Sequence, residues 1–394
     1  MRVLADNVYA VGVQHWDRRL FDELVPLPHG TSYNAYLVKG SEKTALLDTV
    51  DPEKTELLIG HLLKAGANKI DYIISHHAEQ DHSGSIPDML LMYPDAKVVT
   101  NPKCAKMLVD HLHLDQDQII QIEEGQTLSL GDKTLKFIYT PWVHWPETMS
   151  TWLQEDKILF SCDFFGSHLA TGNLFVTDEA RTLEGAKRYY GEIMMPFRNS
   201  IRGNLKKLEP LDIQMIGPSH GPVWNKPRVI IEAYTEWVDE SVIANKVVVP
   251  YVSMHESTEK MVEYLVEALI ERNIGVQQFN LPVSDLGEMV IDLVDAATVI
   301  LGSPTVLVGA HPSAVYCAAL MNALRPKTRF VGIIGSFGWG SKMVEQLTGL
   351  MGNLKAEMFE PVLARGAATE AGYTALDELA DNILQKHRAL GIAQ

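Results

Sequence analysis

The sequence predicts an α/β protein of two domains, the second of which is a doubly wound parallel sheet. Three observations lead to this fold class. Short strand-like runs broken by turn residues fill the first part, and from about residue 246 strands alternate regularly with helix-length segments. Eleven of the 14 histidines also lie before residue 245. Since regular strand–helix alternation is typical of doubly wound sheets, we expect domains at residues 1–245 and 246–394.

The first part contains segments whose apolar patterns predict strands and helices. Helical periodicity predicts helices over residues 52–65 and 228–240. Runs rich in β-branched, aromatic and aliphatic residues predict five strands, over residues 33–38, 44–48, 72–75, 97–100 and 134–139.

The second part follows a more regular rhythm. A buried strand over residues 246–252 leads into an amphipathic helix over 258–273. Four further strands are expected, over residues 275–281, 298–302, 329–335 and 356–363. The domain boundary is placed at residues 241–245, on the change of pattern alone.

Composition and charge exclude several classes of protein. The 394 residues are 46% apolar and 21% charged, which excludes a disordered or fibrous chain. With 34 basic and 50 acidic residues the net charge is −16, which argues against nucleic acid as a partner. No apolar run is long enough for a transmembrane helix, and Asp6 interrupts the start where a secretory signal would be apolar. The three widely spaced cysteines support no disulfide framework, so we expect a reducing cytoplasm.

A cluster of potential metal ligands follows the strand predicted at 72–75. Four of them fall between His77 and His82, in the order His77, Glu79, Asp81, His82. At a strand end, residues two apart point the same way, and the following turn can aim the next pair at a neighbouring point. Each residue singly could be a surface acid, a helix cap or a core histidine, but the group favours two metals side by side.

Three later residues add further candidates. His144 lies in an apolar loop, Asp163 is an acid among hydrophobic residues at a likely strand end, and His220 closes a Gly/Pro loop. Burying any of them without a partner is costly, so each needs a cation or hydrogen-bonding groups. Taken alone, each is at best evenly balanced between a ligand and an ordinary buried polar residue.

Together these motifs resemble the metallo-β-lactamase-like domain of the flavodiiron proteins, also called A-type flavoproteins. The order HxExDH, His, Asp, His fits that family, as do the separations of 62 and 19 residues from His82 to His144 and on to Asp163. The resemblance implies an αββα sandwich and a non-haem diiron site. In that pattern one iron is held by His77, Glu79 and His144, the other by Asp81, His82 and His220, and Asp163 bridges them. His76 lies one residue outside the motif, where a supporting or structural role is expected.

Glu79 is the residue that distinguishes two interpretations of this site. Hydrolases of the superfamily usually carry HxHxDH, where imidazole suits zinc. A carboxylate in place of that histidine makes the site harder and more anionic, which suits iron cycling between its two oxidation states. Manganese or zinc could use the same ligands, so the alternative of a zinc hydrolase with an appended flavodoxin domain stays open.

Loops of the second part offer a binding site for a phosphate and a flat ring. The loop Ser253, Met254, His255, Glu256, Ser257, Thr258 precedes a helix and could bind phosphate, although an ordinary capping turn is the favoured explanation of this loop taken alone. The sequence contains neither G-x-G-x-x-G nor a Walker A lysine pattern. Gly302-Ser303-Pro304-Thr305 and Gly335-Ser336-Phe337-Gly338-Trp339-Gly340 follow two later strands, where loops line a ligand crevice.

This half resembles a flavodoxin-type FMN domain, with loop motifs that match those of flavodiiron proteins. The resemblance implies that residues 253–258 hold the FMN phosphate. It also implies that the flavin ring is bordered by Pro304, Thr305, Ser336, Phe337, Gly338, Trp339 and Gly340. Family members often carry asparagines where this chain has Val306-Leu307-Val308, so the flavin potential is expected to differ.

The resemblance also implies an activity and partners. It indicates reduction of dioxygen to water, of nitric oxide to nitrous oxide, or of both, with Tyr190 and His168 near the irons. Electrons would come from a separate donor, such as a rubredoxin or a reduced deazaflavin- or NADH-linked reductase. Since flavin and irons belong to different domains, a homodimer, or a tetramer made of two such dimers, is expected. A flavin carrier that has lost its metals is a further alternative.

Overall fold

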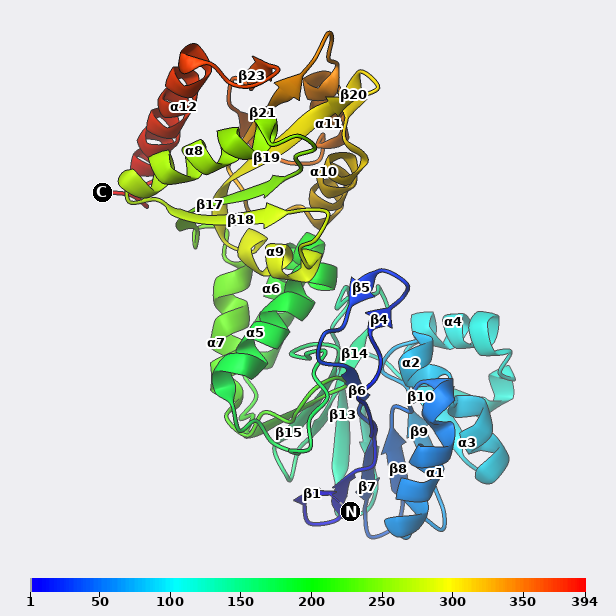
Figure 1. Cartoon of the computed structure of the whole chain (residues 1–394). Coiled ribbons are helices and arrows are strands. Elements are labelled where there is room, and N and C mark those ends of the chain that lie inside the picture. The colour runs from blue at the N-terminus through cyan, green and yellow to red at the C-terminus, as the bar shows by residue number, and fades with distance from the viewer. Residues whose placement is uncertain (1) are drawn as a thin grey trace. The chain divides into compact units, whose positions relative to one another are not determined.

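The computed structural model describes residues 2–394 and divides into two compact α/β units (Figure 1). The first unit consists of Met1–Tyr189 and Phe197–Val238, and the second of Tyr190–Pro196 and Asp239–Gln394. At the start of the second unit, the carbonyls of Asp239 and Val242 accept hydrogen bonds from the buried Nζ of Lys327, which belongs to the same unit.

Two β-sheets form the centre of the first unit. The larger has the strand order β1-β2-β7-β8-β9-β10-β11 and the smaller β12-β13-β14-β15-β16. The larger sheet is built from β1 Arg2–Ala5, β2 Val8–Ala10, β7 Tyr36–Lys39, β8 Thr44–Leu47, β9 Tyr72–Ile74, β10 Lys97–Thr100 and β11 Ile119–Gln121. The smaller contains β12 Thr127–Ser129, β13 Thr134–Tyr139, β14 Met149–Leu153, β15 Ile158–Cys162 and β16 Met215–Pro218. Two short ribbons accompany them, β3 Val13–His15 with β6 Thr31–Tyr33 and β4 Leu20–Phe21 with β5 Val25–Pro26.

The core of this unit lies between the two sheets. Val38 and Leu47 of the larger sheet pack in one cluster with Phe137 and Phe160 of the smaller. Helices flank the sheets on their outer sides, as Figure 1 shows. They are α1 Thr55–Lys64, α2 Gln80–Ser83, α3 Ile86–Met92, α4 Pro102–Leu112, α5 Glu179–Tyr189, α6 Arg198–Leu208 and α7 Pro227–Val238. The layers are those of the predicted αββα sandwich, in which the strand ends of both sheets can meet at one edge.

The single strand predicted over residues 33–38 is wrong. The structure has two strands here, β6 and β7, which belong to different sheets. Asn34 lies between them, and its side chain donates hydrogen bonds to the carbonyls of Pro218 and Gly221, at 2.8 and 2.7 Å. These hydrogen bonds, which join residues distant in the sequence, hold the chain where it changes sheets.

The second unit is a parallel sheet with helices on both faces, which confirms the predicted doubly wound fold. Its order is β18-β17-β19-β21, with β22 and β23 both paired to β21 and β20 forming an antiparallel hairpin with β19. The strands are β17 Ala244–Tyr251, β18 Gly275–Asn280, β19 Ala296–Val306, β20 Gly309–Ala310, β21 Phe330–Phe337, β22 Glu357–Met358 and β23 Val362–Arg365. The helices are α8 Ser257–Glu271, α9 Leu286–Leu293, α10 Pro312–Leu324, α11 Met343–Leu350 and α12 Glu370–Ala389.

Two apolar clusters cover the faces of this sheet. One joins the sheet to α8 and α12, and the other joins it to α9, α10 and α11. The strand expected over 356–363 is in fact two short strands, β22 and β23, on either side of Phe359–Pro361. Pro361 has no N–H to donate, so a continuous ladder is interrupted there.

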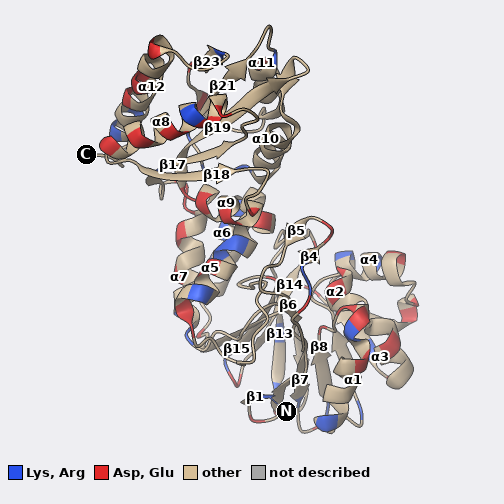
Figure 2. Cartoon of the chain, viewed as in Figure 1, with Lys and Arg blue, Asp and Glu red and all other residues tan. Residues whose placement is uncertain are grey.

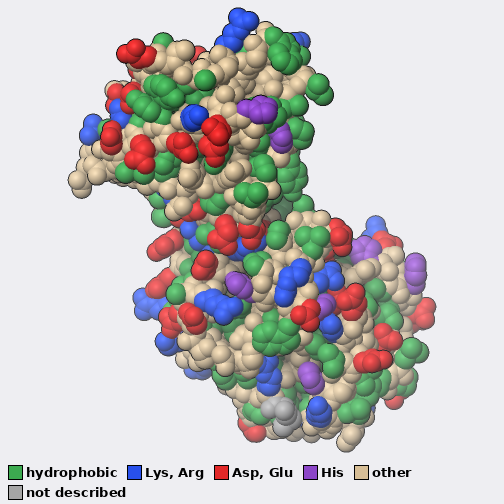
Figure 3. Space-filling view, viewed as in Figure 1, with side chains coloured by type: hydrophobic (Ala, Val, Ile, Leu, Met, Phe, Trp, Pro, Cys, Tyr) green, Lys and Arg blue, Asp and Glu red, His purple; other side chains and the backbone are tan. Residues whose placement is uncertain are grey.

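Charged residues lie on the surfaces of both units. In Figure 2 acidic residues recur along α8 and α12, and in Figure 3 acidic and basic side chains are interspersed over the visible face of the first unit. Within residues 2–394, no helix has the length and apolar character needed to cross a membrane.

Candidate metal centre

The seven predicted metal ligands all come from segments that follow or connect strands of the first unit. His77 and Glu79 lie in the loop after β9, and the short helix α2 carries Asp81 and His82. His144 lies between β13 and β14, Asp163 directly follows β15, and His220 follows β16. Because these strand ends meet at one edge of the sandwich, side chains up to 143 positions apart converge.

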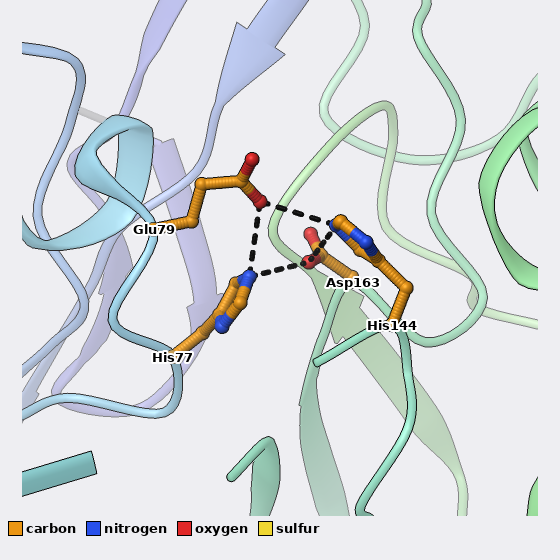
Figure 4. Close-up of side chains that lie close together, drawn as sticks. All are labelled: His77, Glu79, His144 and Asp163. Atoms are coloured by element: carbon orange, nitrogen blue, oxygen red, sulfur yellow. Dashed lines mark hydrogen bonds and ion pairs between the residues drawn. The ribbon is translucent and has the colours of Figure 1, made fainter. Parts of the chain in front are cut away.

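The first group of side chains is shown in Figure 4. One oxygen of Glu79, Oε2, lies 3.0 Å from Nε2 of His77 and 3.1 Å from Nε2 of His144. Oδ2 of Asp163 lies 3.6 and 3.8 Å from the same two nitrogens. Two imidazoles and two carboxylates therefore surround one point, each with an atom that can bind a metal.

The second group is built in the same way. Asp81 lies between two imidazoles, with Oδ1 at 3.4 Å from Nε2 of His82 and Oδ2 at 3.3 Å from Nε2 of His220. Oδ1 of Asp163 is 3.1 Å from Nε2 of His82 and 3.4 Å from Nε2 of His220. The carboxylate of Asp163 thus presents one oxygen to each group, which is the arrangement of a bridging ligand.

These side chains fit a pair of cations. Both carboxylate oxygens of Asp81 and of Asp163, and both ring nitrogens of His82, are buried without a hydrogen-bond partner. Leaving charged oxygens buried and unpaired is strongly unfavourable, and metal ions would satisfy them. Three carboxylates with four imidazoles form a mixed oxygen and nitrogen donor set that suits divalent iron, manganese or zinc.

The electrostatics of the group favour positive charge. Burial alone would lower the pKa of His220, but the carboxylates of Asp163 and Asp81, 3.4 and 3.3 Å from its Nε2, raise that pKa to about 10. Burial likewise opposes ionisation of Asp163, yet the neighbouring His82, His220 and His77 hold its pKa well below the usual range. A field that retains protons so strongly also attracts metal cations, which compete with protons for the same atoms.

Hydrogen bonds from outside the cluster orient two of the histidines. His77 Nδ1 donates to Oε1 of Glu147 at 2.6 Å, and His220 Nδ1 donates to the carbonyl of Ser32 at 2.6 Å. Each bond leaves Nε2 free to face the cluster, as is usual for histidines that bind metals. Sequence reasoning assigned no role to Glu147, although the residue is only three positions from His144 and 2% exposed.

His76 does not join the cluster, in agreement with the supporting role expected for it. Its Nδ1 donates to Oδ2 of Asp48 at 2.7 Å, and its Nε2 lies 2.7 Å from Oγ1 of Thr151. The other oxygen of Asp48 accepts the backbone N–H of His76 at 2.9 Å. This buried network positions the start of the ligand loop.

His168 and Tyr190 were both predicted to lie near the metals, and they occupy different positions in the structure. The ring of His168 lies 4.8 Å from that of His220, and its Nδ1 is 2.9 Å from Oγ1 of Thr31. Tyr190 is fully buried in the π-helical segment Tyr190–Met194 and belongs to the second unit. The preceding Tyr189, which no sequence pattern singled out, packs on His168 at 4.7 Å and on His220 at 5.6 Å.

A pocket of about 410 Å³ opens onto the cluster. Glu79 and Asp81 reach it from the metal side, while Phe21 and Asp22 come from the β4–β5 hairpin and Trp145 from the loop after β13. The pocket is large enough to admit a small molecule to the ligands of both groups.

The loops predicted to hold FMN gather at the carboxyl edge of the second unit's sheet. Oγ1 of Thr258, at the start of α8, lies 3.0 Å from Oγ of Ser336 at the end of β21. Pro304 pairs directly with Ser336 in the sheet. Trp339 is 84% exposed, and a Cβ built at Gly338 or Gly340 would meet no atom within 4 Å, so this loop borders open space. Hydroxyl groups, a helix start and an exposed tryptophan thus lie at the same edge of the sheet.

Comparison with known proteins supports this assignment of both halves. A family model described as "ODP family beta lactamase" matches residues 31–221, which include all seven predicted ligands. The chain is 35% identical to a nitric oxide reductase of Moorella thermoacetica, over 93% of this chain and 92% of that one. It is 34% identical to a coenzyme F420H(2) oxidase of Methanothermobacter marburgensis, over 90% and 89%. A rubredoxin-oxygen oxidoreductase of Megalodesulfovibrio gigas is 33% identical over 98% of each chain.

Solved structures also match almost the whole length of the chain. A rubredoxin:oxygen oxidoreductase from Desulfovibrio gigas superposes with a TM-score of 0.95 at 30% identity, over 99% of each chain. A flavodiiron protein from Giardia intestinalis superposes with a TM-score of 0.93 at 25% identity, over 99% of this chain and 97% of that one. Fold and site therefore define a metallo-β-lactamase-like protein with a paired-metal site and an attached doubly wound domain. The chain belongs to the flavodiiron protein family.

Proposed function

We propose that this protein is an oxidoreductase that reduces dioxygen to water, nitric oxide to nitrous oxide, or both, using two irons and one FMN. The observation that carries the proposal is the division of seven donor side chains into two groups that share Asp163, with a carboxylate, Glu79, in the first group. The relatives named as a nitric oxide reductase, an oxygen oxidoreductase and an F420H(2) oxidase support it.

In this proposal each group of side chains holds one iron. His77, Glu79 and His144 would bind the first, Asp81, His82 and His220 would bind the second, and Asp163 would contact both. Once bound, the irons would supply electrons and open positions for a diatomic gas, while FMN would deliver electrons to them singly. Glu79 adds negative charge to the first group, which favours the higher oxidation state of iron.

Side chains around the ligands keep this centre ordered. Glu147 holds the His77 ring with Nε2 toward the cluster. The ring of Phe21 packs against that of His168, with 4.9 Å between the ring centroids. Burial and the neighbouring His220 hold the pKa of His168 well below its usual value, so its ring is neutral. A neutral, packed ring adds no further cation beside the metals, and Tyr189 closes its other side.

The second unit would bind FMN at the carboxyl edge of its sheet. Backbone N–H groups and hydroxyls of residues 253–258 suit the phosphate, because the helix α8 begins there. Pro304, Thr305 and residues 336–340 would border the ring, with Trp339 as its flat neighbour. The electron donor would be a separate molecule, a rubredoxin or a reduced deazaflavin- or NADH-linked reductase. The three buried, unpaired cysteines accord with a reducing cytoplasm as its location.

The zinc hydrolase with an appended flavodoxin domain is the second candidate, and substitution of Glu79 separates the two. Protein purified anaerobically should contain about two irons and one FMN per chain. Glu79→His should shift binding toward zinc and lower gas reduction, while FMN content stays unchanged because the flavin loops lie in the other unit. Glu53→His, at an exposed acid, serves as the matched control. Zinc at both positions of the native chain with negligible iron would exclude the redox function.

Stopped-flow oxidation of the reduced protein by each gas tests the substrate. Faster oxidation by dioxygen than by nitric oxide, or the reverse, would assign the preference. No oxidation by either gas in protein that holds both irons and FMN would refute the proposal.

We further propose that the working form is a homodimer, or a tetramer made of two such dimers, in which each flavin serves the irons of the partner chain. A two-fold interface of this kind closes on itself. Mixing a Glu79→His protein with a Trp339→Ala protein should then restore activity, because each mixed dimer contains one intact pair of sites. A mixture that stays inactive after demonstrated subunit exchange would show that electrons pass within one chain.

A further inference from the structure

Two acidic side chains line the pocket beside the metal centre without belonging to the ligand set. Glu79 and Asp81 reach this pocket from the two ligand groups, whereas Asp22 and Asp51 line it and belong to neither group. Asp22 lies in the turn between β4 and β5, and Asp51 directly precedes the short helix Pro52–Lys54. The binding of the metals as described above therefore gives these two carboxylates no role.

The four carboxylates of the pocket differ in burial in the order expected of a path from solvent to the ligands. Asp22 is exposed, Asp51 and Glu79 are partly buried, and Asp81 is only 5% exposed. Both oxygens of Asp81 lack a hydrogen-bond partner among the described residues, so the most buried carboxylate of the pocket retains its full capacity to bind a cation. A cation arriving from solvent thus meets acidic oxygens first outside the centre and then at the ligands themselves.

The balance of charge in this pocket attracts cations. Its lining contains four carboxylates and one guanidinium, that of Arg18, whose Nε donates to the carbonyl of Leu20 at 2.7 Å. Phe21 and Trp145 supply apolar wall to the same pocket. A cleft that is lined mainly by one sign of charge and has apolar walls concentrates the electric field, which raises the rate at which the opposite charge enters.

We propose that Asp22 and Asp51 form an entry site for divalent metal cations on their way to Glu79 and Asp81. The inference rests on the proposed function, because it takes the two ligand groups to hold divalent metals. Carboxylate oxygens suit hard divalent cations and replace part of the water that a hydrated ion carries. The two entry residues govern how fast metal arrives, whereas the seven ligands govern how tightly it is held.

Substitution of each entry residue by Asn removes one charge and preserves the local backbone. Asn tolerates the positive φ of 49° at position 22. It also serves as an N-cap in place of Asp51, whose Oδ1 accepts the N–H of Glu53 at 2.9 Å. The matched control is Asp132→Asn, because exposed Asp132 likewise accepts a backbone N–H, that of Ser41 at 2.6 Å, and does not line the pocket.

Stopped-flow mixing of metal-free, full-length protein with Fe²⁺ under anaerobic conditions measures the rate of uptake. Tryptophan fluorescence reports it, because paramagnetic Fe²⁺ quenches a nearby indole and the ring of Trp145 lies 4.9 Å from that of His77. At low ionic strength Asp22→Asn and Asp51→Asn should each slow association about three- to tenfold, and Arg18→Gln should accelerate it by a similar factor. The dissociation rate should change by less than about twofold, since charges at the rim of a site act mainly on association. Salt at about 0.5 M should remove most of these differences in rate.

The outcomes separate this inference from the function on which it rests. Equal association rates in the native chain and in both pocket variants would overturn the entry site. Equal slowing in the Asp132→Asn control would overturn it too, because the net charge of the chain would then explain the effect. Faster dissociation with unchanged association would mean that the two side chains hold the metal rather than admit it, which also contradicts the inference. If the native chain takes up no Fe²⁺, the proposed function itself fails.

Discussion

Substitution of Glu147 is the most direct test of how the metal centre is supported. Its buried carboxylate accepts Nδ1–H of His77 at 2.6 Å and the N–H of Ala78 at 3.1 Å. Burial alone would raise the pKa of Glu147, but the bond to His77 lowers it, so the group is ionised. An ionised partner makes the imidazole a better electron donor and fixes the ring in the orientation that binds metal.

The size of the effect depends on which of these two hydrogen bonds each substitution removes. Loss of such a supporting carboxylate typically weakens metal binding 10- to 100-fold, which corresponds to about 1.4–2.7 kcal/mol. Glu147→Gln keeps an oxygen that can accept from His77 but removes the charge, so about tenfold is expected. Glu147→Ala leaves two buried N–H groups unpaired, at about 1–3 kcal/mol each, so about 100-fold or more is expected.

Competition between metal-free protein and a ferrous chelator, followed anaerobically, measures this loss. The weakened step should be that of the group containing His77, Glu79 and His144, and FMN binding should not change. The matched control is Glu155→Gln, because exposed Glu155 also accepts a backbone N–H, that of Thr134 at 2.7 Å, at a distant turn. If both Glu147 variants bind iron as tightly as the native chain, Glu147 plays no part in orienting His77.

Three further predictions concern the second unit. Burial lowers the pKa of His387 to about 4, below its unfolded value of about 6.5. The free energy of unfolding should therefore be at its full value above pH 6.5 and should fall as the pH drops toward 4. The loss is about 2 kcal/mol at pH 5, and urea unfolding of His387→Gln over this range should show a weaker pH dependence. Trp339→Ala should weaken FMN retention while iron content stays at the native level, and a parallel loss of iron would point to misfolding instead. Gly335→Ala would place a Cβ 2.0 Å from the carbonyl oxygen of Ser303 and should cost about 1–3 kcal/mol in urea unfolding. Gly349→Ala, in a helix with open space around it, should instead stabilise by about 0.5–1 kcal/mol, and equal effects would contradict the packing argument.

Much of the candidate metal centre could be predicted because several potential ligands lie close together in the sequence. His77, Glu79, Asp81 and His82 follow a buried strand within six positions, and that spacing sends alternate side chains to neighbouring points. His144, Asp163 and His220 were each ambiguous alone, and family resemblance joined them to the set. No spacing rule could show that the two oxygens of Asp163 face different groups, because that depends on where β15 ends relative to β9 and β16.

The residues that were missed act through contacts distant in the sequence. Glu147 contacts His77, which is 70 positions away in the sequence. Tyr189, the last residue of α5, contacts His168, which lies before that helix. Tyr190 was named from family resemblance, and an apolar run does not show which of two adjacent helical residues, about 100° apart in direction, faces the site. The chain also leaves one strand and begins another at Asn34, whose partners lie more than 180 positions away.

The sequence by itself determined the two fold types, the ligand set and the loops of the second unit, because strand periodicity, helix starts and ligand spacing are local properties. Only the tertiary structure decided the division of the candidate ligands into two groups and the support of His77 by Glu147. Both depend on the meeting of strand ends, which is set by the packing of the whole unit. Local patterns state which groups are available, and the packed fold determines which atoms they face.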